Sequence, residues 1–327
     1  MKRFVRWGVT GVALLALPAG ARAIDAKTAL NKLGFPSDTE QQALAGQFVE
    51  IALGTSSERD VNVGIAFLVK QPPEKLARTV MKEMLLSRVD PDMIAYARFD
   101  GEGALAQLAG LKLTPTQLKA YANAQPGEDL NLSSEEIAGL HAAGKDADAV
   151  QNKVHELLLA RYRAYRAKGL AGIAPYARKG SQTDPAGDLA KDDHLARESN
   201  LLPAEFHDLL DNYPRGAPSG LAENFYWSQF KAHGVDTIAL VHAFQGTFGR
   251  TLVSVERHYY VSTGYNTEQA IAGFLPAEGG TLVIYTNHTS TDQVAGFGEG
   301  GKRSIGRKIM ASELKKLFDK ARAPATQ

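Results

Sequence analysis

One segment of the 327-residue chain carries side chains that could perform acid–base chemistry, and it reads Glu256-Arg257-His258-Tyr259-Tyr260. In a strand, alternate side chains point to opposite faces, which predicts that Glu256, His258 and Tyr260 share one face. A carboxylate raises the pKa of a neighbouring imidazole, so the first two could form an acid–base pair. The same side chains could instead line a cavity and orient a ligand, or face solvent with no special role.

A glycine-rich segment reads Gly296-Phe297-Gly298-Glu299-Gly300-Gly301-Lys302-Arg303. It is not a P-loop, because Arg303 stands where that motif needs Ser or Thr to hold magnesium. The glycines could open a helix whose first-turn Lys302 and Arg303 receive a phosphate or carboxylate. In the alternative interpretation, they only permit the chain to turn from a strand into a helix.

Other catalytic patterns are weak. His242, His258 and His288 fall on predicted strands and could converge on zinc, although isolated strand histidines are usually structural. The chain has no H-E-x-x-H pair and no G-x-S-x-G nucleophile elbow, and no pair of acids stands out for glycoside cleavage. We therefore predict no catalytic residue, metal or cofactor, and we leave open whether the protein is an enzyme.

Composition narrows the class of protein. With 44% hydrophobic and 22% charged residues, the chain is an ordinary globular protein rather than a disordered one. The absence of Cys excludes disulfides, thiolate metal sites and a Cys nucleophile. A formal net charge of +1 argues against a nucleic-acid partner, since such proteins usually carry a strongly basic face.

The first 23 residues have the features of a cleaved export signal. Lys2, Arg3 and Arg6 precede an apolar run, and Ala21-Arg22-Ala23 matches an A-x-A cleavage site. The run is shorter than the ~20 residues of a membrane span, and no later stretch is apolar enough to cross a bilayer. We therefore expect a periplasmic protein cleaved near Ala23, with no transmembrane span after cleavage.

After the signal the pattern divides the chain into three parts. Residues 24–100 contain predicted strands over 48–53 and 61–69, and Pro72-Pro73-Glu74 is typical of a helix start. Residues 101–217 are predicted to be a mostly helical insertion. It contains one clear helix over 148–168, ended by Gly169, and an exposed excursion or mobile lid over 177–200.

Residues 218–327 contain four predicted strands and one long helix. The strands span 235–244, 250–262, 269–275 and 281–287, and the helix spans about 302–322. Its apolar side is predicted to comprise Ile305, Ile309, Leu314, Leu317 and Phe318. This order predicts an α+β fold in which a curved antiparallel sheet grips a C-terminal helix, as in the helix-grip fold of START and polyketide-cyclase proteins. The fold alone carries no function.

Short motifs spread over most of the mature chain give it a broader resemblance. They are Ser57-Glu58-Arg59-Asp60-Val61, Pro72-Pro73-Glu74, Ala122 to Gly127, Phe225-Tyr226-Trp227-Ser228, Tyr260-Val261-Ser262 with Tyr265, Tyr285 to Thr289 with Asp292, and Gly298 to Arg303. With these motifs the chain resembles a group of exported bacterial proteins that has no assigned activity. The resemblance implies a shared fold and supplies no mechanism.

The leading expectation is a soluble periplasmic protein that binds a hydrophobic or amphipathic, lipid-like small molecule. Tyr and Trp suit such a site because each offers an apolar body with one polar tip. Lys302 and Arg303 at the mouth of the site favour an anionic head group. The alternatives are an enzyme that uses Glu256 and His258, and a structural or assembly partner in the cell envelope. The expected ligand contacts are Trp227, His258, Tyr260, Tyr265, Asn287, Asp292, Lys302 and Arg303.

Overall fold

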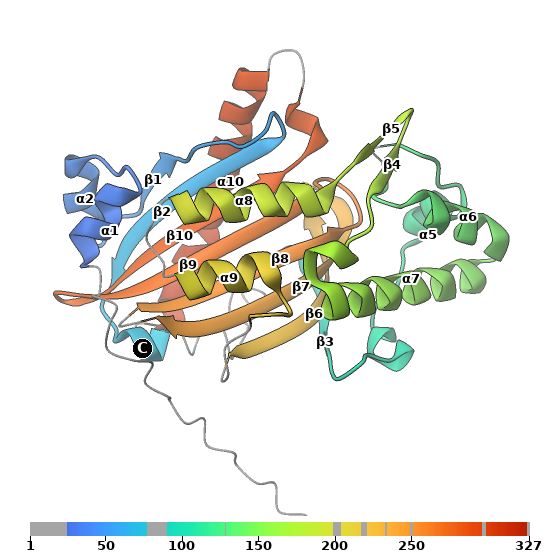
Figure 1. The fold of residues 1–327 in the computed structure, drawn as a ribbon, viewed down its shortest axis with the longest axis horizontal. Coiled ribbons are helices and arrows are strands. Elements are labelled where there is room, and N and C mark those ends of the chain that lie inside the picture. Colours follow the sequence, from blue (N-terminus) through green and yellow to red (C-terminus); the bar gives the residue numbers. More distant parts are fainter. Residues whose placement is uncertain are drawn as a thin grey trace, which may run out of the picture.

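The computed structural model of the chain describes residues 25–76, 90–127, 129–198, 204–216, 221–232, 234–248, 251–295 and 299–325. The predicted export signal therefore lies outside the described residues, as does the continuation of the predicted helix after residue 76. Within the described part the protein has an α+β fold, with a large antiparallel sheet and a long C-terminal helix (Figure 1). These coarse features were predicted from the sequence.

Eight strands form the main sheet in the order β1-β2-β10-β9-β8-β7-β6-β3, and every neighbouring pair is antiparallel. A two-stranded hairpin of β4 (Tyr176–Arg178) and β5 (Ser181–Thr183) stands apart. The strands of the main sheet are β1 (Val49–Ala52), β2 (Asp60–Val69), β3 (Met93–Phe99), β6 (Ala222–Ala232), β7 (Val235–Phe248), β8 (Thr251–Val261), β9 (Thr267–Ala277) and β10 (Gly280–Ser290).

The six predicted strands are confirmed as β1, β2 and β7 to β10, whereas β3 and β6 were not predicted. In β3 the alternating half-buried and exposed positions include Ala95, Ala97 and Arg98, which give little apolar signal. In β6 polar residues such as Asn224 and Gln229 interrupt the aromatic ones. β3 forms by pairing with β6, which lies far away in the sequence, and β6 pairs with both β3 and the adjacent β7, so the pattern within each strand alone does not reveal them.

Helices supply the rest of the ordered structure. Three short 3₁₀ turns, Leu105–Leu108, Gly169–Gly172 and Asp292–Val294, link them to the strands. The helices are α1 (Ala26–Lys32), α2 (Ser37–Leu44), α5 (Pro115–Ala122), α6 (Ser134–Ala143), α7 (Ala147–Lys168), α8 (Pro185–Glu198), α9 (Ala204–Asn212) and α10 (Glu299–Ala325).

Helix α7 confirms the clearest helix prediction. Asp146 caps its first turn by accepting a hydrogen bond from the Ala149 amide, and the helix ends at Gly169 with φ of 59°. The prediction of an exposed excursion or lid over 177–200 was wrong. This segment completes the β4–β5 hairpin and forms α8, whose Leu189 and Asp193 are fully buried. Three aspartates of this polar segment, Asp188, Asp192 and Asp193, are buried.

The helices divide between the two faces of the sheet. In Figure 1, α7, α8 and α9 lie in front of the sheet and α10 lies behind it. We call these the α8 face and the α10 face. On the α10 face, Phe67 of β2 and Val283 of β10 share a core cluster with Phe318 of α10. On the α8 face, Arg257 of β8 pairs with Asp193 of α8.

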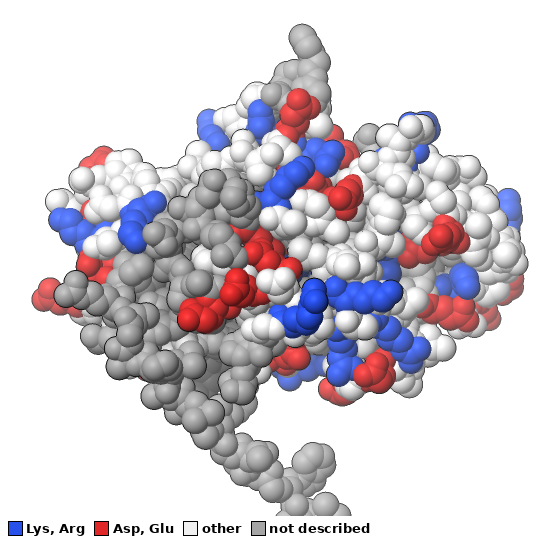
Figure 2. Space-filling view, viewed as in Figure 1, with Lys and Arg blue, Asp and Glu red and all other residues white. Residues whose placement is uncertain are grey.

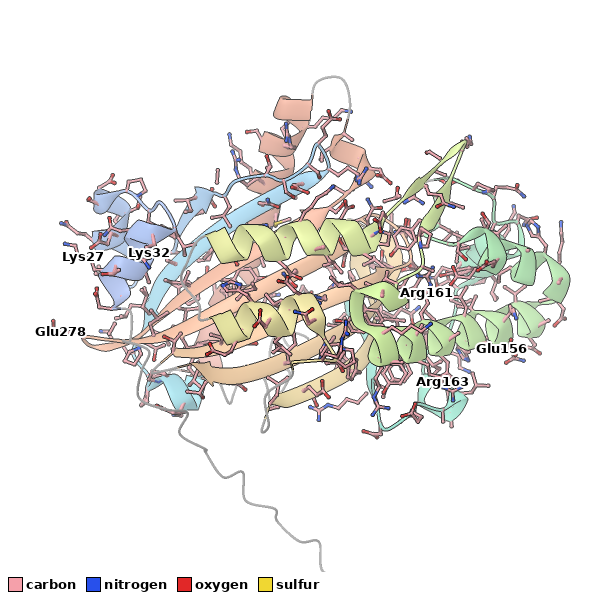
Figure 3. The ribbon with its side chains drawn as sticks, viewed as in Figure 1. Lys27, Lys32, Glu156, Arg161, Arg163 and Glu278 are labelled. Atoms are coloured by element: carbon pink, nitrogen blue, oxygen red, sulfur yellow. The ribbon has the colours of Figure 1, made fainter. Side chains whose placement is uncertain are left out.

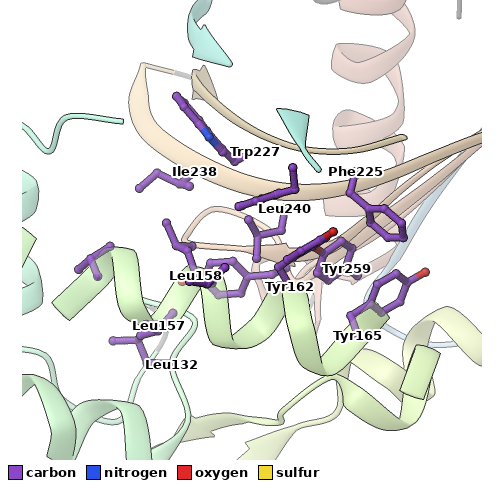
Figure 4. Close-up of a cluster of buried hydrophobic side chains, with 14 of the residues drawn as sticks. Leu132, Leu157, Leu158, Tyr162, Tyr165, Phe225, Trp227, Ile238, Leu240 and Tyr259 are labelled. Carbon is purple, nitrogen blue, oxygen red and sulfur yellow. The ribbon is translucent and has the colours of Figure 1, made fainter. Parts of the chain in front are cut away.

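The larger core fills the space between α7 and the α8 face of the sheet (Figure 4). The rings of Tyr165 on α7 and Tyr259 on β8 stack in parallel, with centroids 4.0 Å apart. Nearby, the ring of Tyr162 stacks on Phe99 of β3 and meets Phe225 of β6 edge-on. Aromatic pairs of this kind add about 0.5–1.5 kcal/mol each beyond their burial. They attach α7 to three strands of the sheet.

Helix α10 packs differently from the sequence prediction. Ala311 and Phe318 are its buried contacts, whereas Ile305 and Ile309 are 62% and 43% exposed. At 100° per residue, Ile305 lies more than 120° around the helix from Phe318, so the two cannot share one narrow buried stripe. Placing both isoleucines on the core side of the helix was therefore wrong.

Candidate functional site

Strand β8 places Glu256 and His258 on the α10 face, as the alternation predicts, but it sends Tyr260 to the other face. Pairing with β7 shifts register at this point, since Leu240 opposes Tyr260 and Val241 opposes His258. Tyr259 is thus an extra residue, and a β-bulge of this kind reverses the alternation beyond it. Tyr259 and Tyr260 both enter the core on the α8 face. The prediction that Tyr260 shares a face with His258 was wrong for this reason.

Around His258 the α10 face carries a patch of polar side chains from four strands and one loop. His258 opposes Glu268 on β9, and Glu268 opposes Thr289 on β10, so the three form a row across the sheet. We call this surface the His258 patch. It consists of Tyr226, Glu256, His258, Tyr265, Glu268, Tyr285, Asn287 and Thr289. Three predicted ligand contacts, His258, Tyr265 and Asn287, therefore lie on one surface.

Hydrogen bonds fix the orientation of the two central groups. The Tyr265 hydroxyl lies 2.7 Å from His258 Nδ1, and the Tyr226 hydroxyl donates to Glu256 Oε1 at 3.2 Å. Burial raises the pKa of Glu256, while the neighbouring His258 and Tyr226 partly oppose that rise. In the described structure no hydrogen bond joins Glu256 to His258, so the two are neighbours rather than a formed acid–base pair.

Asn287 belongs to a second chain of hydrogen bonds in the patch. Its side-chain amide donates to the Tyr285 hydroxyl at 3.2 Å, and its oxygen accepts from the Thr289 hydroxyl at 2.8 Å. The Thr289 hydroxyl also lies 3.5 Å from a carboxylate oxygen of Glu268. These contacts hold the patch in place from strand β10.

Small apolar side chains lie between the polar tips. Glu256 is flanked by Ala243 on β7 and Ala270 on β9, and His258 is flanked by Val241 on β7. Ala243 and Val241 belong to a buried apolar cluster that also contains Ala239, Val261 and Tyr226. The patch thus combines a floor of small apolar groups with half-buried polar tips at Glu256, His258 and Tyr265.

The other predicted contacts lie elsewhere. Trp227 is buried on the α8 face, where its indole N–H donates to the Gln107 carbonyl at 2.9 Å. It lines a cleft of about 540 Å³ beside Ala95 and Ala97 of the edge strand β3. This cleft and the His258 patch are on different parts of the molecule.

Tyr260 packs under a buried arginine of α7. This arginine is Arg161, which Figure 3 labels. The Arg161 guanidinium lies 4.2 Å from the centre of the Tyr260 ring and pairs with Glu136 at 2.6 Å. A desolvated cation over an aromatic face contributes about 2 kcal/mol or more. Burial raises the pKa of Tyr260 well above its usual value. Tyr260 therefore helps to hold α7 against the sheet.

Structural partners also hold the remaining predicted contacts, which are Asp292, Lys302 and Arg303. The Arg178 guanidinium donates to Asp292 Oδ2 at 3.0 Å, and Arg59 Nε lies 3.7 Å from Asp292 Oδ1. Lys302 Nζ lies 3.4 Å from the Ala295 carbonyl, and Arg303 donates to the Ser57 carbonyl at 3.4 Å. The predicted contacts thus occupy several regions, and only His258, Tyr265 and Asn287 share a patch.

Sequence reasoning did not detect a row of buried polar side chains on the α8 face. Register pairing aligns them across five strands, from β2 to β7. All five are at most 6% exposed. The sequence signal for this row was Arg257, a charged residue on the same strand face as the buried Val253 and Val255. The row consists of Asn62, His288, Gln269, Arg257 and His242.

Arg257 is the centre of this row. It pairs with Asp193 of α8 at 2.9 Å, donates to Gln269 at 2.8 Å, and reaches the Leu210 carbonyl of α9 at 3.2 Å. Gln269 in turn donates to Asp193 at 2.6 Å. The charges and hydrogen-bonding groups are matched, so the network ties α8 and α9 to the sheet.

The row contains two histidines, His242 at one end and His288 beside Asn62 near the other, and both are neutral at neutral pH. Burial lowers the pKa of His288 to about 4, and its Nδ1 lies 3.7 Å from Asp192 Oδ1. Burial, reinforced by neighbouring carboxylates, raises the pKa of Asp192 well above its usual value. Burial also lowers the pKa of His242 to about 4, although its Nε2 lies 3.1 Å from Glu223.

These placements also correct the three-histidine zinc hypothesis. His242 and His288 lie on the α8 face and His258 lies on the α10 face, so the three cannot bind one ion. In the described part of the chain, no group of three or more His, Asp or Glu residues could hold a metal ion.

Among the described residues, no helix combines the length and apolar character needed to cross a bilayer.

Figure 2 shows both basic and acidic side chains on the face covered by α7, α8 and α9, with uncharged residues between them. Comparison with protein families, curated proteins and solved structures found no match for the chain. The functional argument therefore depends on the geometry of the His258 patch.

Proposed function

We propose that the protein binds a hydrophobic or amphipathic small molecule at the His258 patch. The observation that supports this most directly is the alternation of small apolar and half-buried polar groups on one sheet face. Ala243 and Ala270 flank Glu256 with short side chains, each 5% exposed, so an apolar ligand body would lie against the half-buried groups above them. His258 and Tyr265 then offer hydrogen bonds to the polar end of the same molecule.

A helix-grip-like arrangement is part of this proposal. Helix α10 packs on the same sheet face through Ala311 and Phe318, as a gripped helix does. Near the start of α10, Gly306 lies against Val61, whose register partner is Thr289 of the patch. Lys302 and Arg303 belong to that first part of the helix, where they favour a ligand with an anionic end. The proposed site of action is the periplasm, on the basis of the export signal in the first 23 residues.

Native mass spectrometry of the mature protein, purified from its own periplasm, tests this function. We expect a stoichiometric apolar molecule that organic extraction releases and identifies. The double variant His258→Ala/Tyr265→Phe is expected to lose most of that occupancy. His141→Ala, an exposed histidine on α6, serves as the matched control and should retain it.

Lipid uptake by delipidated protein is the measurement that can contradict this function. If it takes up no fatty acid, phospholipid or hopanoid under the same conditions, the binding function is wrong. If it takes up ligand equally well with and without His258 and Tyr265, binding occurs but the patch is not the site.

The second candidate function is acid–base catalysis at the same patch, which the raised pKa of Glu256 favours. A carboxyl group with a raised pKa, close to an imidazole, could act as a general acid toward a bound substrate. Glu256→Gln keeps the shape and the acceptor for Tyr226 but removes the titrating group. An enzyme would retain its ligand and lose turnover in this variant, whereas a binding protein would show no turnover to lose.

A further inference from the structure

The outer face of α10 carries two large apolar side chains in solvent. Ile305 and Ile309 are 62% and 43% exposed and lie one helical turn apart. The opposite side of the helix packs on the sheet through Ala311 and Phe318. In Figure 1, α10 lies behind the sheet, on the side away from α8 and α9. The two isoleucines are therefore on the side of α10 that does not pack on the sheet.

Basic side chains surround this apolar pair. Between Gly300 and Lys320 the sequence has seven Lys and Arg residues and two acidic ones. One of the acids, Asp319, pairs with Lys315 at 2.5 Å. Mature protein without residues 1–23 has a formal net charge of −3, since removal of four basic residues lowers the value of +1. Positive charge is thus concentrated on one helix. The exposed lysines nearest the outer face are Lys308, Lys316 and Lys320.

We propose that this outer face of α10 docks on a bilayer surface rich in anionic lipid. Apolar side chains flanked by lysines are the pattern of a helix that lies in the membrane interface. Ile305 and Ile309 would enter the boundary between head groups and acyl chains, while the lysines keep their charges at the phosphates. The helix has 27 residues and is about 40 Å long, so it can lie along the surface while its inner side stays on the sheet.

A bilayer fits this surface better than a protein partner does. A stable protein interface needs about 800 Å² on each side, and two isoleucines with flexible lysines supply a much smaller apolar centre. An anionic bilayer requires only an apolar anchor and diffuse positive charge, and both are present. The proposal is independent of ligand binding at the His258 patch, because it depends on the opposite side of α10.

Vesicle co-flotation of the chain that begins at residue 24 tests the proposal. The probes are vesicles of phosphatidylcholine alone and of phosphatidylcholine with 30% phosphatidylglycerol, each at low and high salt. We expect binding only to the anionic vesicles, weakened by salt. The double variant Ile305→Ser/Ile309→Ser should abolish it. Lys308→Gln and Lys316→Gln should each weaken it about fivefold at low salt.

Two exposed residues provide matched controls. Ile94→Ser changes an isoleucine that is 50% exposed on β3, and Lys119→Gln changes an exposed lysine on α5. Both should bind like the parent protein. The proposal is overturned if the parent protein ignores anionic vesicles, or if the Ile305→Ser/Ile309→Ser variant binds as well as Ile94→Ser does. A dimer in solution that this double variant converts to a monomer would also overturn it, because the face would then be covered by a second copy.

Discussion

Replacement of Asp193 by Asn tests whether the Arg257 network holds α8 to the sheet. The substitution preserves size and the hydrogen bond with Gln269 but leaves the Arg257 guanidinium, 1% exposed, without its counter-charge. Breaking a buried ion pair from one side costs about 3–5 kcal/mol of unfolding free energy. Arg257→Met should cost less, because the remaining Asp193 can take up a proton, and burial already raises its pKa. Arg257 cannot lose its charge in the same way, because arginine stays protonated in proteins.

Urea unfolding of the chain that begins at residue 24 measures the difference. Trp227 is the only tryptophan after residue 23, and it is buried, so its fluorescence follows loss of the core. Glu156→Gln is the matched control, since it removes one partner of the exposed pair with Lys153 and should change stability by about 1 kcal/mol or less. A loss below about 1 kcal/mol for Asp193→Asn, or a larger loss for Arg257→Met, would show that the network does not hold α8 in this way.

Three further outcomes follow from the same structure. His242 and His288 have folded pKa values of about 4, below the unfolded 6.5, so their neutral forms stabilise the fold at neutral pH. That stability is lost as pH falls from 6.5 towards 4, and linkage gives about 2 kcal/mol per histidine between pH 8 and pH 5; His288→Gln should reduce this dependence in urea titrations at the two pH values, and an unchanged dependence would contradict the shift. Gly169→Ala should destabilise strongly, by about 3 kcal/mol or more, because a Cβ there overlaps the Tyr213 carbonyl oxygen at positive φ; a variant as stable as the parent in thermal unfolding would refute this. The fluorescence of Trp227 should be blue-shifted and poorly quenched by iodide, and ready quenching would contradict its burial.

Local pattern predicted the elements whose own residues specify them. The helix over 148–168 has a capping Asp146, an apolar stripe and a terminating glycine, and it formed as predicted. The strands β7 to β10 carry dense β-branched and aromatic residues, and they formed within a few residues of the predicted limits. Strands β3 and β6 lack this density and depend on each other and on β7. These two strands therefore form only as part of the assembled sheet.

The site residues show where such reasoning stops. Alternation along β8 is enough to predict that Glu256 and His258 share one face of the strand. It failed two residues later, because one extra residue relative to β7 turned Tyr260 to the other face. Aromatic and polar content alone could not separate residues of the patch from Trp227 and Asp292, which satisfy their polar atoms in other parts of the fold.

The sequence by itself determined the α+β class, most of the strands, the long helices and the shared face of Glu256 and His258, since these depend on periodicity and end signals within short segments. Only the tertiary structure decided which polar residues meet. Asn62, His288 and Arg257 lie far apart in the chain and form one buried row through the register of antiparallel strands. Pairing across the sheet also decided which side of α10 is buried and left Ile305 and Ile309 in solvent. A helix has several apolar positions, and the surface that it packs against determines which of them become core.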